Sequence, residues 1–133
     1  MEQDEPVMLV GHSLGGAVIS LCAEICPQKI KRLVYVAAWL LKSGCSVDGP
    51  ISMRPLNWAH KNPEAPAAQY EPVYTTEKFE SIPRVYVRTT LDMSILPEIW
   101  DKMLEELPCE RVYAIPSGHM VQLSKPDELN AVI

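Results

Sequence analysis

Short, continuously apolar segments alternate along this chain with longer stretches in which apolar residues recur at helical spacing. Four segments predict strands, at residues 7–10, 33–38, 84–89 and 111–115. The first two are continuously apolar, which is typical of strands that a parallel sheet buries on both faces, whereas 84–89 alternates more. Helical spacing predicts helices at residues 14–26, after Pro97, and at 128–133. Strands that alternate with helices favour an α/β fold, a mostly parallel sheet of about four strands with flanking helices.

The segment 40–83 differs in composition from the rest of the chain. It is 44 residues long and holds six of the twelve prolines, which exclude long helices from most of it. A connection of this length inside a compact domain is usually functional or disordered. We therefore predict one domain, residues 1–133, with a proline-rich, lid-like insert at 40–83.

Composition excludes several classes of function. The 133 residues are 47% hydrophobic and carry a net charge of −5, so one domain can bury a core, and no basic patch favours nucleic acid or an acidic membrane. The longest apolar run has nine residues, 33–41, and is too short to span a bilayer. The acidic first residues do not resemble a signal peptide. The four cysteines match no zinc or redox spacing, which predicts reduced thiols, no metal site and a cytoplasmic location.

A motif with specific chemistry lies between the first predicted strand and the first predicted helix. Residues 11–15 read Gly-His-Ser-Leu-Gly, the G-x-S-x-G pattern of a nucleophile elbow, in the strand–turn–helix setting that such an elbow needs. The sharp turn projects the hydroxyl of Ser13 above the sheet, and the backbone N–H of Leu14 can donate to a developing oxyanion. The alternative is a glycine-rich turn with a solvated serine.

A nucleophilic serine needs a base, and the chain has three histidines. His119 follows the fourth predicted strand and lies after the serine in the chain, as the order serine, acid, histidine requires. His12 adjoins Ser13, but we expect its side chain to point elsewhere on the tight turn. His60 lies in the insert and is predicted to be a surface residue. His119 is therefore the candidate base.

The acid that orients the base is expected at the end of the strand between them. Asp92 stands directly after the third predicted strand and 27 residues before the histidine, where it can fix the imidazole tautomer and stabilise the imidazolium. Asp101 and Asp127 are expected to be solvated, and Glu98 to complement the dipole of the helix that it begins.

These motifs resemble the α/β-hydrolase superfamily and, within it, the plant-type methylesterase and hydroxynitrile lyase group. The elbow is common to the superfamily. The closer resemblance is carried by Thr-Thr-Leu-Asp at 89–92, Ile-Leu-Pro at 95–97 and Gly-His-Met-Val-Gln-Leu-Ser-Lys-Pro at 118–126.

The resemblance implies a triad of Ser13, Asp92 and His119 that cleaves small carboxylic esters of the methyl type, with no metal or organic cofactor. It also implies that in the lyases a lysine after the catalytic histidine handles cyanide. This chain has Met120 there and Leu14 after the serine, which favours an esterase over a hydroxynitrile lyase.

The chain also departs from that family. The family's sheet has eight strands, and this sequence predicts only the last four, so it resembles the C-terminal portion. The loop that supplies a second oxyanion donor is not among these residues, and the insert is short for the family's lid. Strand 7–10 would then have an unpaired apolar edge, which predicts either self-association or a longer parent protein. The alternative to an esterase is therefore a non-catalytic, truncated remnant or interaction module of this fold.

Overall fold

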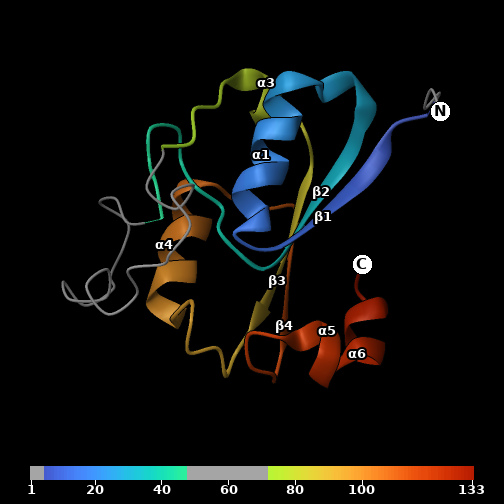
Figure 1. Ribbon diagram of the computed structural model, residues 1–133, viewed down its shortest axis with the longest axis vertical. Helices are drawn as coiled ribbons and strands as arrows, with labels where there is room; N and C mark the ends of the chain where they lie inside the picture. The colour runs from blue at the N-terminus through green and yellow to red at the C-terminus, as the bar shows by residue number, and fades with distance from the viewer. Residues whose placement is uncertain (1–4, 48–71) are drawn as a thin grey trace.

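The strands of this protein form a single parallel sheet. The computed structural model describes residues 5–47 and 72–133, and the sheet order is β1-β2-β3-β4 (Figure 1). The strands are β1 (Val7–Ser13), β2 (Ile30–Ala38), β3 (Arg84–Thr89) and β4 (Arg111–Ile115). The predicted parallel α/β fold is confirmed. The first two strands are longer than predicted: β1 continues through the elbow to Ser13, which pairs with Ala38, and β2 begins at Ile30, which pairs with Val7.

Helices connect the strands and flank the sheet. They are α1 (Gly15–Ile25), the 3₁₀-helix η1 (Pro27–Lys29), α3 (Glu77–Glu80), α4 (Pro97–Glu106), α5 (Val121–Ser124) and α6 (Pro126–Asn130). The prediction of a last helix at 128–133 was wrong in its bounds. The helix begins earlier, because a proline in its first turn loses no hydrogen bond. No helix within the two described ranges has the length and apolar character to cross a membrane.

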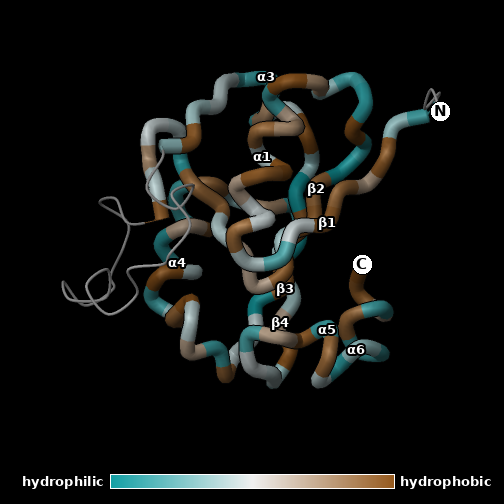
Figure 2. The backbone as a smooth tube through the Cα atoms, viewed as in Figure 1, coloured by the Kyte–Doolittle hydropathy of each residue, from teal (hydrophilic) through white to brown (hydrophobic). Residues whose placement is uncertain are grey.

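Side chains of β2 alternate between two hydrophobic cores, one on each face of the sheet. Leu33 and Tyr35 pack with residues of α1 and α4 in the larger core. Val34 and Val36 pack in a smaller core with Val121 of α5 and with α6. Residues of high hydropathy accordingly lie along α1 and the strands that it covers (Figure 2). This double coverage explains why β2 is continuously apolar from Leu33 to Ala38.

Two buried tyrosines stack on each other below α1, and their hydroxyls are hydrogen bonded. The ring centroids of Tyr35 and Tyr86 lie 6.2 Å apart. The Tyr35 hydroxyl is 2.7 Å from Ser20 Oγ, and the Tyr86 hydroxyl donates to the carbonyl of Ala38 at 2.6 Å. Burial raises the pKa of both phenols well above the usual value, so both remain neutral and tie β2 and β3 to the region behind the elbow.

The predicted insert is described only at its two ends, and residues 48–71, including His60, lie outside the described residues. The ends are held together by an antiparallel bridge between Cys45 and Val73. Glu24 of α1 then fixes the start of α3, because its carboxylate accepts hydrogen bonds from the backbone N–H and the hydroxyl of Thr76, both at 2.7 Å. These bonds lower the pKa of Glu24. The lid-like role of the insert stays a prediction.

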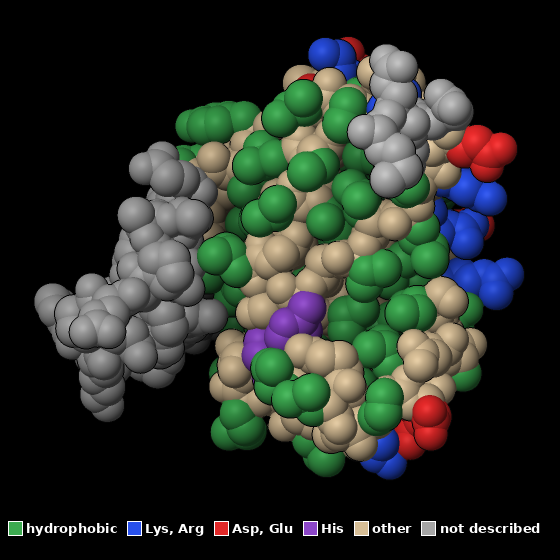
Figure 3. All heavy atoms as spheres, turned by 45° about the vertical axis from the view of Figure 1, so that its right-hand side comes forward, with side chains coloured by type: hydrophobic (Ala, Val, Ile, Leu, Met, Phe, Trp, Pro, Cys, Tyr) green, Lys and Arg blue, Asp and Glu red, His purple; other side chains and the backbone are tan. Residues whose placement is uncertain are grey.

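Strand β1 lies at one edge of the sheet in the described part of the chain and exposes apolar side chains. Val7, Met8 and Val10 are 37%, 45% and 47% exposed, so the prediction that this strand is covered on both faces does not hold within these residues. The view that brings this side forward shows hydrophobic side chains over much of the surface, with charged groups toward its margins (Figure 3). An apolar edge strand of this kind is a template for pairing with another strand.

We expect the chain to self-associate through this edge, and Val10→Lys to reduce the association, because a lysine on an edge strand opposes strand pairing. Sedimentation velocity over a range of protein concentrations measures the effect. Val112→Lys is the matched control, since Val112 is 44% exposed on β4 at the opposite edge. A wild-type chain that stays monomeric at high concentration would contradict the expectation.

Candidate active site

The candidate nucleophile occupies a strained turn between β1 and α1. Ser13 is the last residue of β1 and has a φ of 54°, in the left-handed region that residues other than glycine rarely adopt. Helix α1 begins two residues later, at Gly15, with Leu14 as its N-cap. This is the strand–turn–helix geometry of a nucleophile elbow, as the motif predicted. The backbone of Leu14 therefore lies at the positive end of a helix dipole.

Two glycines let the turn close. A Cβ atom at Gly11 would lie 2.6 Å from the carbonyl oxygen of Gly15, and one at Gly16 would lie 2.4 Å from the carbonyl oxygen of Trp39. A Cβ atom at Gly15 would meet nothing within 4 Å. On the helix side, then, the close approach depends on Gly16, which lies outside the five-residue motif and which the motif alone did not single out.

The candidate acid is a buried carboxylate whose oxygens are all hydrogen bonded. Asp92 is 3% exposed. Its Oδ1 accepts the backbone N–H groups of Ser94 at 2.7 Å and Ile95 at 3.1 Å, and its Oδ2 accepts the hydroxyl of Thr89 at 3.1 Å and His119 Nδ1 at 2.7 Å. Burial alone would raise the pKa of this carboxyl, but the hydrogen bonds from His119 and the two backbone amides outweigh it and lower the pKa. Asp92 is therefore an anion at neutral pH.

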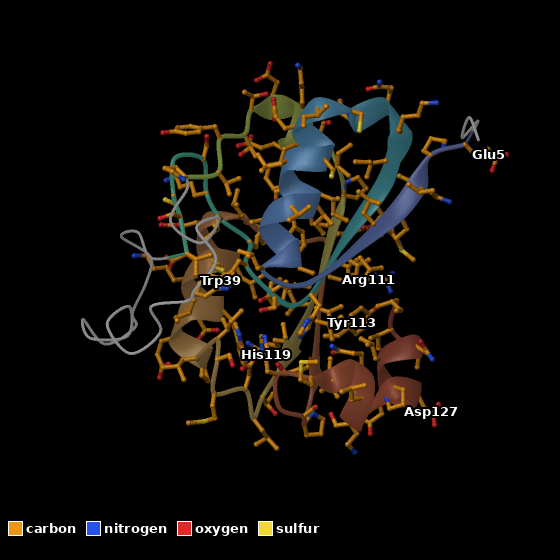
Figure 4. All side chains as sticks on the ribbon, in the orientation of Figure 1. Glu5, Trp39, Arg111, Tyr113, His119 and Asp127 are labelled. Carbon is orange, nitrogen blue, oxygen red and sulfur yellow. The ribbon has the colours of Figure 1, made fainter. Side chains whose placement is uncertain are left out.

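The candidate base is held against that carboxylate by paired loops. Thr90 N–H donates to the carbonyl of Ile115 and Leu91 N–H to that of Ser117, both at 3.0 Å, so the segment after β3 runs beside the segment after β4. His119 lies at the carboxyl ends of the strands (Figure 4). Because its Nδ1 donates to a carboxylate, the neutral ring has an unprotonated Nε2 that can accept a proton.

His12 does not point away from the site, and this prediction was wrong. Its Nε2 donates to the backbone carbonyl of His119 at 2.8 Å, and the two ring centroids lie 4.7 Å apart with 47° between the planes. No hydrogen bond of the described residues joins the Ser13 hydroxyl to the His119 ring. Catalytic hydrogen bonds of this kind are often long when no substrate is bound. His12, which adjoins Ser13 in the chain, contacts the candidate base directly.

The fold of the chain is similar to that of known structures. It superimposes with a TM-score of 0.78 on a pyrethroid hydrolase, at 22% identity over 98% of this chain and 69% of that one. It superimposes with a TM-score of 0.77 on a methylesterase from Arabidopsis, at 23% identity over the same shares. The fold is that of an α/β-hydrolase.

Sequence relatives of this chain include plant proteins. Methylesterase 17 of Arabidopsis thaliana is 26% identical over an alignment that covers 93% of this chain and 63% of the relative. The alpha-hydroxynitrile lyase of the same plant is 27% identical, over 97% of this chain and 69% of the relative. The chain thus spans about two thirds of the length of these relatives. No family model matches it.

Exposed apolar residues lie close in the chain to the candidate acid and base. Leu91 and Met93, on either side of Asp92, are 65% and 85% exposed, and Met120, next to His119, is 47% exposed. Leu123 on α5 is 75% exposed. We call these four residues the apolar rim. The rim could not be predicted from the sequence, because the apolar pattern does not show which side chains the loops after β3 and β4 leave exposed.

The remaining acidic candidates lie apart from the site, as predicted. Asp101 is exposed and pairs with Arg88 at 3.4 Å, Asp127 is exposed, and Glu98 lies in the first turn of α4. Residues 5–47 and 72–133 contain no cluster of three or more potential metal ligands.

Proposed function

We propose that this chain carries the catalytic groups of a serine esterase that acts on small carboxylic esters of the methyl type. The observation that carries the proposal is the 2.7 Å hydrogen bond between buried Asp92 and His119, at the same edge of the sheet as a serine held at a φ of 54°. A carboxylate, an oriented imidazole and a partly exposed, strained serine are the parts that acyl transfer requires.

In the first half of the reaction, Ser13 Oγ attacks the ester carbonyl carbon and its proton moves to His119 Nε2. The carbonyl oxygen becomes an oxyanion, to which the backbone N–H of Leu14 donates. Asp92 stabilises the imidazolium that forms. The carbon–oxygen bond to the alcohol then breaks, the imidazolium gives its proton to the departing alkoxide, and an acyl group stays on the serine.

In the second half, a water molecule takes the place of the alcohol. His119 accepts a proton from the water as it attacks the acyl carbon, and returns that proton to Ser13 Oγ as the acid leaves. His119 accepts or donates the proton in each of these steps. The cycle regenerates the starting tautomer, which Asp92 holds.

Two further observations support an ester substrate. Several curated relatives are named methylesterases, and the apolar rim would border the organic part of an ester beside the reacting groups. Burial of the rim against such a ligand would contribute about 25 cal/mol per Å² of apolar surface. A small apolar ester therefore suits the site better than a charged substrate does.

A fluorophosphonate tests the proposal, because its phosphorus reacts with an activated serine and releases fluoride. We expect intact-mass analysis to show one adduct on the wild-type chain and none on Ser13→Ala. Ser81→Ala, which removes an exposed serine remote from the elbow, is the matched control and should label like the wild type. Equal labelling of Ser13→Ala would refute a Ser13 nucleophile, and an inert wild type would support the non-catalytic reading.

The second candidate reaction is cyanohydrin cleavage, which the hydroxynitrile lyase among the relatives favours. Met120 in place of a lysine after the candidate base speaks against it. Cyanide release from mandelonitrile, measured beside hydrolysis of an activated ester, distinguishes the two. Release above the uncatalysed rate that disappears in Ser13→Ala would favour the lyase.

A further inference from the structure

The candidate base is held at two points, and only one of them is the carboxylate. Asp92 accepts from the side chain of His119 at Nδ1, whereas His12 donates to the backbone carbonyl of the same residue at 2.8 Å. The His12 ring also packs against the imidazole, with centroids 4.7 Å apart. The side chain and the peptide of His119 are thus fixed from two places, the loop after β3 and strand β1.

The sheet order explains why the second point of attachment matters. Ser13 ends β1 and His119 follows β4, and these strands lie at opposite edges of the described sheet. At 4.7–4.9 Å per strand, three spacings separate the two strands by roughly 14 Å. The loop that carries His119 must therefore reach back across the ends of β3 and β2. The hydrogen bond from His12 ties that loop to the elbow, one residue away from the nucleophile.

The same hydrogen bond sets the tautomer of His12. A carbonyl oxygen only accepts, so the proton of the neutral His12 ring lies on Nε2, and this nitrogen cannot take a proton from Ser13. In His119 the proton lies on Nδ1 and Nε2 is free. The two adjoining imidazoles therefore hold opposite tautomers, one suited to donate to a peptide and the other to accept from a hydroxyl.

We propose that His12 is a positioning residue, which holds the peptide of His119 so that the imidazole Nε2 faces Ser13. The inference rests on the proposed function, because it gives His12 its role through the base. His12 would act by keeping the imidazole in the orientation that the reaction needs. Displacement of a reacting group by about 1 Å can lower the rate on the order of 10²-fold. We expect the donated hydrogen bond to matter more than the ring contact, because the bond alone fixes the carbonyl in direction and distance.

Two substitutions separate the hydrogen bond from the ring contact. His12→Gln keeps an N–H donor at a similar reach and loses the aromatic ring, whereas His12→Phe keeps a ring and loses the donor. We expect the second-order rate constant for fluorophosphonate labelling to fall about tenfold or more in His12→Phe and to stay within about threefold of the wild type in His12→Gln. Equal thermal midpoints of the two variants would show that the difference does not come from unfolding.

A second readout does not depend on catalysis. The His119 Nδ1 proton, hydrogen bonded to Asp92, should give a downfield imidazole N–H resonance in the proton NMR spectrum, assigned by its absence in Asp92→Ala. We expect that resonance to shift or broaden in His12→Phe and to persist in His12→Gln. If the wild type does not label but the resonance responds in this way, the proposed function fails and the positioning role stands. If labelling and resonance in His12→Phe both equal those of the wild type, the positioning role is overturned.

Discussion

Replacing Asp92 with asparagine is expected to slow the acylation of Ser13 by about 10³–10⁴-fold while the chain stays folded. An asparagine whose amide oxygen keeps the backbone N–H groups of Ser94 and Ile95 must turn its NH₂ group toward His119. That group donates, so the imidazole would carry its proton on Nε2, where it cannot accept one from the serine. The acylation rate therefore falls because the imidazole of His119 holds the wrong tautomer, whereas the oxyanion donor, the backbone N–H of Leu14, is unchanged.

The rate constants for fluorophosphonate labelling and for hydrolysis of an activated ester measure this effect. Asp101→Asn is the matched control, because it removes one negative charge from an exposed carboxylate on α4 and should leave both rates near those of the wild type. Chemical denaturation of both variants separates a catalytic loss from an unfolding one. An Asp92→Asn chain that labels as fast as the wild type would mean that His119 does not act through this carboxylate.

The sheet and the candidate acid and base could be read from the sequence because parallel sheets impose simple patterns. Buried strands are apolar throughout, and the residues that follow them meet at one edge of the sheet. Asp92 after β3 and His119 after β4 are consequently neighbours, with 2.7 Å between Oδ2 and Nδ1. The bounds of these two strands also agree with the prediction.

The role of His12 could not be read in the same way. The motif gives the position of the elbow but not the direction of the side chain before the serine, which depends on how far the loop after β4 reaches back. The contact of Gly16 with the carbonyl of Trp39 was missed for a related reason. Both are tertiary contacts between segments far apart in the chain, and local pattern carries no information about them. The hydroxyl partners of Tyr35 and Tyr86 belong to the same class.

These tertiary contacts form a support behind the candidate nucleophile. The N–H of Trp39 donates to the carbonyl of Ser13 at 3.0 Å, directly beyond Ala38, whose carbonyl accepts the hydroxyl of Tyr86. Ala37, one residue earlier, has a φ of 43° and shares with Ser13 the left-handed backbone that residues other than glycine avoid. The strained serine is therefore held by a hydrogen bond from the end of β2, where the backbone is strained as well. Helix α1 packs closely against the same segment at Gly16.

Gly16→Ala is accordingly expected to destabilise the chain by about 3 kcal/mol. A Cβ atom there would lie 2.4 Å from the carbonyl oxygen of Trp39 and 2.9 Å from the Cβ atom of Ala38, and the first of these is backbone that cannot turn aside. Relief requires α1 to move away from the end of β2, which would disturb the Trp39 hydrogen bond to Ser13. Labelling by the fluorophosphonate should therefore fall together with stability.

Gly15→Ala supplies the matched control one residue away. Its Cβ atom would meet nothing within 4 Å, and neither glycine has a left-handed backbone, so space alone distinguishes the two positions. Because alanine is the better helix former, we expect Gly15→Ala to unfold within about 0.5 kcal/mol of the wild type or at slightly higher denaturant. Urea unfolding of both variants decides the matter. Equal loss in the two would mean that the elbow tolerates separation of α1 from β2, and that the bracing contact is not what holds Ser13 in its strained conformation.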